Sequence, residues 1–258
     1  RGLKHEEEEL SEHGEAWGES YQDNLSGEAL PPHLVRAARR EEIDFMLDWQ
    51  VWEEVPVEEC WRATGKGPLG SRWVDVNKGD DTEPNVRSRF VAKEIAFYKD
   101  DDFFAAMPPL EALRLLISHA ATEGQKRKIL VIDARKAHLH ATPTRDIFVE
   151  LPPELKKPGV CGKLKRCLYG TRDAPARWEA FLAEELSKHG FARGIASACC
   201  FKHLERDVRC VVHGDDFVAV GRRDELMKTQ KALEDKYKLK VEMLGQKKGE
   251  SQEVKILN

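Results

Sequence analysis

Two apolar runs, at residues 210–212 and 217–220, flank a tight turn, and this pattern predicts a β-hairpin. Gly214 supplies the backbone freedom that the turn needs. Asp215 and Asp216 follow it, and two like charges at a hairpin tip repel each other unless a cation lies between them. The turn is therefore either a solvated Gly-Asp-Asp turn or a site for a divalent metal ion, because turns are rich in these residues and Mg²⁺ prefers carboxylate oxygens.

Elsewhere, apolar residues at helical spacing and at alternating positions predict the remaining elements. Helices are predicted at about 34–52, from 110 to before Gly124, from 174 to before Gly190 and at about 224–237; strands are predicted at 71–78, 85–93, 128–133, 147–151, 163–170, around 199–201 and at 239–243. Asp173 and Pro175 predict the start of the third helix, with Asp173 as its cap. Residues 1–33 are acidic and lack periodicity, which predicts a disordered linker.

The order of elements after residue 110 is helix, strand, strand, helix, hairpin, helix, strand. This order predicts an α+β fold, with an antiparallel sheet of the split βαβ (ferredoxin-like) kind and its helices on one face. In such a sheet, the strand that ends on Asp133 can lie beside the hairpin tip, although Asp133 could equally cap the turn that follows it. Asp133, Asp215 and Asp216 would then meet, and three carboxylates around two Mg²⁺ ions suit in-line displacement at phosphorus.

Three cations share one side of the predicted strand at 85–93. Arg87, Arg89 and Lys93 occupy alternate positions there, and alternate residues of a strand point to the same face. They could line a phosphate site, or they could form an ordinary exposed strand face.

The charge distribution suggests that the protein binds a polyanion. Residues 1–60 hold 17 acidic and 5 basic side chains, and the remaining residues hold the other 29 acidic and 37 basic ones. An acidic leader joined to a basic body is typical of a polyanion-binding domain with an attached tail, although a modest excess spread over solvated faces would give the same count.

No apolar run is long enough to span a membrane. The six cysteines show no C-x-x-C spacing, which predicts reduced, buried thiols of an intracellular protein.

Six segments resemble the reverse transcriptase of copia-type LTR retrotransposons, in the order expected of that family. They are Trp52-Glu-Glu-Val-Pro56, Ser71-Arg-Trp-Val74, Arg87-Ser-Arg-Phe-Val-Ala-Lys93, Phe104 with Pro108 and Leu113-Arg-Leu-Leu116, Asp133-Ala-Arg-Lys-Ala-His-Leu-His140, and Leu168-Tyr-Gly-Thr-Arg-Asp-Ala-Pro-Ala-Arg-Trp178. The last is long and close to the family's Leu-Tyr-Gly-Leu-Lys-Gln-Ala-Pro-Arg-x-Trp. The resemblance covers residues 52–244, most of the chain.

The resemblance implies a fingers–palm polymerase core over residues 34–258, after the linker at 1–33. It implies fingers at about 61–108 and 142–167, a palm at about 109–141 and 168–243, and an incomplete thumb at the C-terminus. The implied activity is that of an RNA-directed DNA polymerase, which adds dNTPs to a primer on an RNA or DNA template. The parent polyprotein would also hold integrase and ribonuclease H regions, and it would work in the cytoplasm, in a virus-like particle, or in the nucleus. A second hypothesis is an inactive or co-opted fragment that only binds nucleic acid.

The resemblance also assigns roles to residues. It implies that two Mg²⁺ ions, or Mn²⁺ in their place, are held by Asp133, Asp215 and Asp216. It implies that the nucleotide lies near six residues: Arg87, Arg89, Lys93, His138, Tyr169 and Gly170. The cationic side chains there would bind phosphates, and the other residues would contact the bases by stacking or through the backbone.

Three positions depart from the family pattern. His213, followed by Gly214, stands where the family has Tyr or a similar residue, and Asp173 replaces a Gln near the nucleotide cleft. His138 replaces a Phe whose bulk normally excludes a 2′-hydroxyl, so we predict weaker selection of deoxynucleotides. The histidines at 138, 140 and 213 could suggest zinc, but no cysteine stands in register with them, which disfavours a zinc site.

Overall fold

The computed structural model describes residues 20–80, 82–95, 105, 107–122, 126–234, 237, 239–245, 247, 249–254 and 256. The chain divides into two compact units, one formed by Arg1–Phe45 with Trp73–Phe90 and the other by Met46–Arg72 with Val91–Asn258. Residues 1–19 of the predicted linker lie outside the described residues. Within the described part of the chain, no helix is both long and apolar enough to cross a bilayer.

The first unit contains a short hairpin where the sequence predicts the end of the linker. Its strands are β1 (Tyr21–Gln22) and β2 (Ala29–Leu30), and helix α1 (Pro32–Asp48) follows them. The hairpin is ordered by the carboxylate of Asp23, which accepts hydrogen bonds from the backbone N–H groups of Leu25 at 2.6 Å and Asn77 at 2.6 Å. These bonds also lower the pKa of Asp23, because they favour its charged form.

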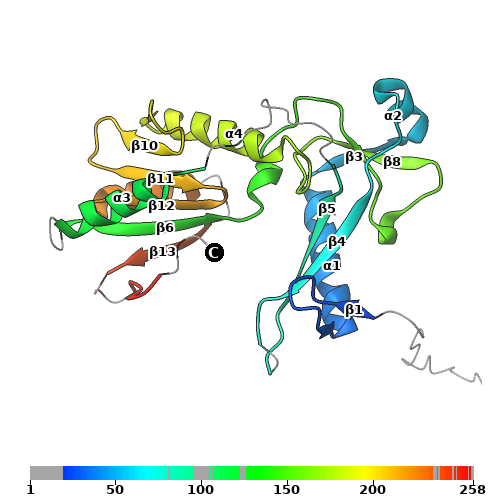
Figure 1. The fold of residues 1–258 in the computed structure, drawn as a ribbon, viewed down its shortest axis with the longest axis horizontal. Helices are drawn as coiled ribbons and strands as arrows, with labels where there is room; N and C mark the ends of the chain where they lie inside the picture. Colours follow the sequence, from blue (N-terminus) through cyan, green and yellow to red (C-terminus); the bar gives the residue numbers. More distant parts are fainter. Residues whose placement is uncertain are drawn as a thin grey trace, which may run out of the picture. The chain divides into compact units, whose positions relative to one another are not determined.

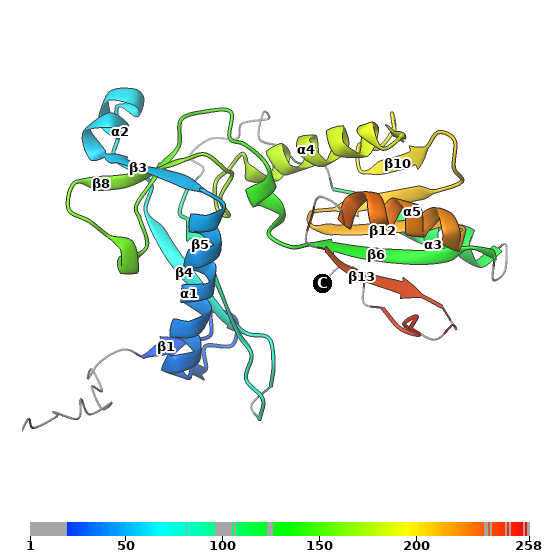
Figure 2. The ribbon, with the colours of Figure 1, turned by 180° about the vertical axis from the view of Figure 1, so that it is seen from behind.

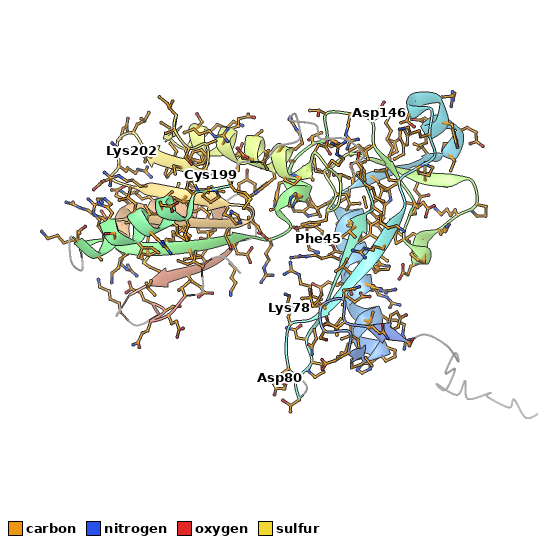
Figure 3. The ribbon with its side chains drawn as sticks, viewed as in Figure 1. Phe45, Lys78, Asp80, Asp146, Cys199 and Lys202 are labelled. Atoms are coloured by element: carbon orange, nitrogen blue, oxygen red, sulfur yellow. The ribbon has the colours of Figure 1, made fainter. Side chains whose placement is uncertain are left out.

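A buried polar contact joins α1 to the two-stranded sheet of β4 (Ser71–Asn77) and β5 (Val86–Ala92). The Asp75 carboxylate, 4% exposed as a residue, accepts hydrogen bonds from Arg39 Nη2 at 2.7 Å and Ser88 Oγ at 2.6 Å. Arg39 also lies 5.2 Å from the ring centre of Trp73. Asp80 lies in the loop between the two strands (Figure 3). Its carboxylate stabilises the loop by accepting a hydrogen bond from Thr82 N at 2.8 Å.

The first helix ends earlier in the structure than the sequence predicts. The helix stops at Asp48 rather than at Trp52, because Gln50 has a φ of +49°, a left-handed conformation that a helix cannot continue through. Trp52 instead begins β3 (Trp52–Pro56), and α2 (Val57–Thr64) follows it. The sequence patterns predicted neither element. Strand β3 pairs with β8 (Val160–Leu164), which also pairs with β7 (Phe148–Val149).

A six-stranded antiparallel sheet forms the core of the second unit (Figures 1 and 2). Its strands, in spatial order, are β13 (Leu239–Leu244), β6 (Lys128–Ala134), β12 (Asp216–Gly221), β11 (Arg209–His213), β10 (Cys200–His203) and β9 (Phe191–Arg193). The 3₁₀ helices η3 (Ala137–His140) and η4 (Pro153–Leu155) lie in the connections after β6 and β7.

Helices cover both faces of this sheet, so the prediction of helices on one face is wrong. Helix α3 (Leu110–Thr122) packs on Val131, Val218 and their neighbours. The opposite face, which includes Leu130 and Phe217, packs against α4 (Ala174–Lys188) and α5 (Arg223–Glu234). The reason is the continuous apolar run along β6 and β12, which leaves two faces to bury instead of one. Figure 2 shows α5 in front of the sheet, and Figure 1 shows α3 in front.

The apolar face predicted for α3 is only partly correct. Leu113, Leu116 and Ala120 are buried, as expected, but Leu110 is 50% and Ile117 38% exposed. The all-apolar stripe is wider than the strip that the sheet covers.

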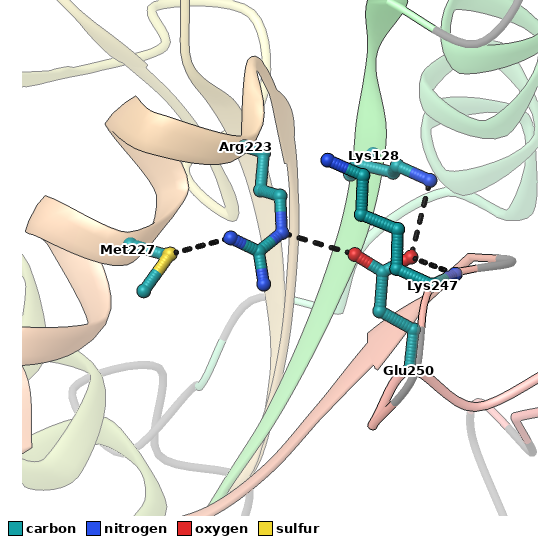
Figure 4. A network of polar contacts seen from close by, with 5 residues as sticks. All are labelled: Lys128, Arg223, Met227, Lys247 and Glu250. Atoms are coloured by element: carbon teal, nitrogen blue, oxygen red, sulfur yellow. Dashed lines mark hydrogen bonds and ion pairs between the residues drawn. The ribbon is translucent and has the colours of Figure 1, made fainter.

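A charged cluster fastens the chain after β13 to the start of β6 and of α5 (Figure 4). The Glu250 carboxylate accepts hydrogen bonds from Arg223 Nε at 3.0 Å, Lys128 Nζ at 3.2 Å and Lys247 N at 3.0 Å. These contacts, led by the Lys247 N–H, lower the pKa of Glu250 to about 2.

All six cysteines are free, and five are buried while Cys200 is half-buried. Burial raises the pKa of Cys161 to about 11 and that of Cys167 to about 12. The prediction of buried thiols is therefore confirmed for five of the six.

Candidate active site

The turn between β11 and β12 consists of two residues, Gly214 and Asp215. Gly214 has a φ of +60° and Asp215 does not have a positive φ, which is the pattern of a hairpin turn with glycine first. Gly214 and Asp215 are both exposed. The Asp215 carbonyl accepts a hydrogen bond from Ala134 N at 3.2 Å, so the end of β6 is tied to the turn.

The pairing of β12 with β6 places Asp216 directly opposite Asp133. Side chains that stand opposite each other in an antiparallel pair point to the same face of the sheet. Both residues are half-buried. The sequence predicted that these acids, far apart along the chain, lie side by side, and the register confirms it for this pair.

Asp215 lies next to the pair, but the three acids do not form a closed set of ligands. Among the residues that the structure describes, no three His, Cys, Asp or Glu side chains converge closely enough to hold a metal ion. The donor chemistry nevertheless fits a hard divalent cation, because two carboxylates face each other across the strands. That Asp133, Asp215 and Asp216 hold such a cation stays a prediction.

Lys240 lies on the other side of Asp133, as its partner in the pairing of β13 with β6. The pKa of Lys240 is raised, mainly by the Glu242 carboxylate 2.8 Å from its Nζ and to a lesser extent by Asp133. Lys240 therefore adds positive charge beside the acidic pair, while its head group is bound to Glu242. The sequence patterns gave no sign of this neighbour, since it depends on strand order.

Four of the six predicted nucleotide-binding residues gather in the second unit. The ring of His138 lies 4.8 Å from that of Tyr169, centre to centre. The Tyr169 carbonyl accepts a hydrogen bond from Ala92 N at 2.8 Å, and Lys93 is the next residue. Gly170 has a φ of +83°, and a Cβ on it would lie 2.0 Å from the Ala92 carbonyl oxygen, so only glycine fits.

Arg87 and Arg89 lie on β5 within the first unit. Burial alternates along this strand: Ser88 and Phe90 are buried, while Arg87 is exposed and Arg89 half-buried. The prediction that these two arginines share one face is confirmed. Their role toward a nucleotide stays a prediction.

Asp173 differs from its predicted role as a helix cap. Its side chain makes no capping hydrogen bond and is 1% exposed as a residue. Instead, Asp173 Oδ1 accepts a bond from Arg145 Nη2 at 3.3 Å, and the same Nη2 donates to Glu94 Oε2 at 2.6 Å. Glu94 also accepts from Arg172 N at 2.8 Å. The extra negative charge is thus paired with an arginine and shielded from solvent.

The sequence did not predict the contacts of two further residues in this region, Trp178 and His140. In the sequence, Trp178 stands only as the last residue of a family-like segment, but its indole Nε1 donates a hydrogen bond to the Gly214 carbonyl at 2.7 Å. His140 is buried between aromatic rings, at 4.7 Å from Trp49 and 4.9 Å from Tyr237. Burial is the main cause that lowers the pKa of His140. Only its position in an aromatic cluster, which sequence spacing does not give, shows that it is a packing residue.

The chain matches the family described as reverse transcriptase (RNA-dependent DNA polymerase) over residues 58–248. It is 25% identical over 211 residues to a retrovirus-related Pol polyprotein from transposon RE1 of Arabidopsis thaliana, which covers 78% of this chain and 14% of that protein. It is 27% identical over 170 residues to the polyprotein from transposon TNT 1-94 of Nicotiana tabacum, with 61% of this chain and 13% of that protein covered. A Ty1-BL Gag-Pol polyprotein of Saccharomyces cerevisiae is 23% identical over 218 residues, with coverage of 84% and 12%.

The chain spans only a small part of these relatives, since it covers 14%, 13% and 12% of the three proteins. Among solved structures, a telomerase from Candida albicans in complex with a fragment of telomeric RNA aligns with a TM-score of 0.45 and 9% identity, over 84% of this chain and 47% of that one. A TM-score below 0.5 does not establish a shared fold. The resemblance to retrotransposon reverse transcriptases that the sequence motifs predict is confirmed by the family match.

Proposed function

Because the chain belongs to the reverse transcriptase (RNA-dependent DNA polymerase) family, we propose that it extends a primer with deoxynucleotides on an RNA or DNA template. The observation that carries this proposal is the pairing of Asp216 with Asp133, with Asp215 in the adjoining turn. This pairing supports a site at which carboxylates from segments distant in the sequence can bind the same metal ions.

In this proposal Asp133, Asp215 and Asp216 would hold the two metal ions, and Asp216 would support one of them less directly. Two Mg²⁺ ions in such a site would activate the attacking 3′-oxygen and stabilise the leaving pyrophosphate oxygen. The end of β6 would position Asp133, and the turn between β11 and β12 would position Asp215. The primer hydroxyl attacks the α-phosphate of the dNTP, and the chain's contribution is to align these groups.

The remaining residues of the proposed site handle the nucleotide. Arg87, Arg89 and Lys93 would meet the triphosphate, because guanidinium and ammonium groups neutralise phosphate charge. Tyr169 and Gly170 would lie against the base and the template. His138, in contact with the Tyr169 ring, would lie below the sugar.

We further infer that the palm comprises about residues 109–141 and 168–243, which include the six-stranded sheet with α3, α4 and α5. The fingers would comprise about residues 61–108 and 142–167. The parent polyprotein would supply integrase and ribonuclease H. The free, buried cysteines support an intracellular setting, in a virus-like particle or the nucleus.

A second candidate is a protein that binds template and primer without extending the primer. The observation that favours it is the open arrangement of the acids, since no three potential ligands converge among the described residues. Binding of the nucleic acid or the ions would have to complete the site in an active enzyme.

One assay separates the two candidates. The protein is incubated with an RNA template, a DNA primer, dNTPs and Mg²⁺ or Mn²⁺, beside Asp215→Asn and a matched control, Asp44→Asn, which changes an exposed acid on α1. We expect extension by the parent and the control, and none by Asp215→Asn. Retained template–primer binding without any extension by the parent would contradict polymerisation and support the binding-only candidate.

A further inference from the structure

The catalytic turn is poorly supported by packing. A Cβ built on Gly214 would meet no atom within 4 Å, so the turn has open space around it. A small cavity of about 60 Å³ lies against the turn, lined by Gly214, His138, Val212, Leu182 and Trp178 among others. A turn with a void beside it and no side chain at its glycine is free to shift, unless hydrogen bonds restrain it.

Two hydrogen bonds do restrain it, one to each carbonyl of the turn. Ala134 N on β6 donates to the Asp215 carbonyl at 3.2 Å, and Trp178 Nε1 on α4 donates to the Gly214 carbonyl at 2.7 Å. The two donors come from different elements. The Trp178 bond fixes the peptide plane that leads into Asp215, and the Ala134 bond fixes the peptide plane that follows it.

Trp178 is well placed to serve as a fixed donor. It is 4% exposed, belongs to the main core cluster and stacks on Phe181 at 5.9 Å between ring centres. An indole has a single N–H donor and two side-chain torsions, so a packed tryptophan presents that N–H at one point in space. Its position is therefore set by the core and does not depend on the turn.

We propose that Trp178 is a positioning residue that holds the Gly214 carbonyl and thereby aims the Asp215 carboxylate at the metal position. This inference rests on the proposed function, because it assumes that Asp215 binds the metal. Trp178 touches no substrate, and it acts through the turn.

The test separates the hydrogen bond from the bulk of the side chain. Trp178 is replaced site-specifically by 3-benzothienylalanine, an isostere in which sulfur takes the place of the N–H, and Trp178→Phe is made in parallel. The matched control is Trp49→Phe, which changes a ring of the same aromatic cluster, 4.7 Å from His140, without touching the turn. Mn²⁺ affinity is measured by electron paramagnetic resonance on the protein without nucleic acid, and thermal unfolding is followed alongside.

We expect the isostere to bind Mn²⁺ about fivefold more weakly, which is the loss that removing one ordinary hydrogen bond produces, with only a small fall in melting temperature. Trp178→Phe should show the same weakening with some loss of stability, and Trp49→Phe should keep the parent's affinity. An isostere that binds Mn²⁺ as tightly as the parent overturns the inference, and so does a parent that binds no Mn²⁺. A parent that binds Mn²⁺ but extends no primer contradicts the proposed function alone, since the fivefold difference can still be read.

Discussion

Asp133 on β6 and Asp216 on β12 stand directly opposite each other in the sheet, with their side chains on one face. Two like charges in this relationship destabilise a sheet. Lys240, the partner of Asp133 on β13, offsets this repulsion only in part, because its head group is bound to Glu242. The pair is therefore a local conflict at the point where the proposed chemistry would occur. This conflict leads to a stability prediction that is independent of activity.

Asp133→Asn should make the metal-free protein more stable by about 0.5 kcal/mol, because it removes one of the two opposed charges. Mg²⁺ at 10 mM should raise the melting temperature of the parent, since a ligand of the folded state stabilises it, and should have little effect on the variant. Urea and thermal unfolding measure both effects, with Asp44→Asn as the control. A variant that is less stable than the parent without metal would show that the acids do not repel each other in the fold.

His138→Phe should improve the selection of deoxynucleotides over ribonucleotides. The imidazole lies against Tyr169 and is smaller than the phenyl ring of the family. In the proposed site it would leave room for a 2′-hydroxyl and could form a hydrogen bond with it. We expect the ratio of ribonucleotide to deoxynucleotide incorporation to fall at least about tenfold. Single-nucleotide extension measures this ratio, with His33→Phe, an exposed histidine on α1, as the control. Equal ratios in parent and variant would remove His138 as the gate.

Arg145→Met should destabilise the protein by about 3 kcal/mol, because it leaves the buried Asp173 and the nearly buried Glu94 without their shared cation. The value is at the low end for a buried pair, since the Arg145 side chain is 35% exposed. The double variant Arg145→Met/Asp173→Asn should recover part of the loss. A double-mutant cycle in urea measures the coupling, and additive effects would mean that Arg145 and Asp173 do not interact.

The Glu250 cluster makes stability depend on acid pH. The pKa of Glu250 is about 2 in the folded protein against an ordinary 4.5, so the folded state favours the charged form. Its contribution is therefore complete above about pH 5 and is lost as the pH falls from 4.5 towards 2. We expect Glu250→Gln to melt at a lower temperature than the parent at pH 7, and the gap to narrow as the pH is lowered to 3. Glu253→Gln, an exposed neighbour, is the control, and a gap that does not change with pH would exclude this carboxylate as the cause.

The sequence alone determined much of the local structure and the family. The alternation at 86–92 and the helical spacing at 110–122 and 174–188 predicted β5, α3 and α4, because burial of one face imposes a period. The Gly-Asp-Asp hairpin and the strand ending on Asp133 were also predicted, since they depend on neighbours along the chain. The family motifs supplied the residues of the site.

Only the tertiary structure decided the relations between distant segments. Helices cover both faces of the sheet because α3 packs on one apolar face of β6 and β12, and α4 and α5 pack on the other. The local spacing of apolar residues does not specify this arrangement. The pairing of Asp173 with Arg145 in place of a helix cap, and the bond from Trp178 to Gly214, join residues 28 and 36 positions apart. Local patterns specify which face of a helix or strand is buried. The partner of a buried polar group depends instead on how the whole chain packs.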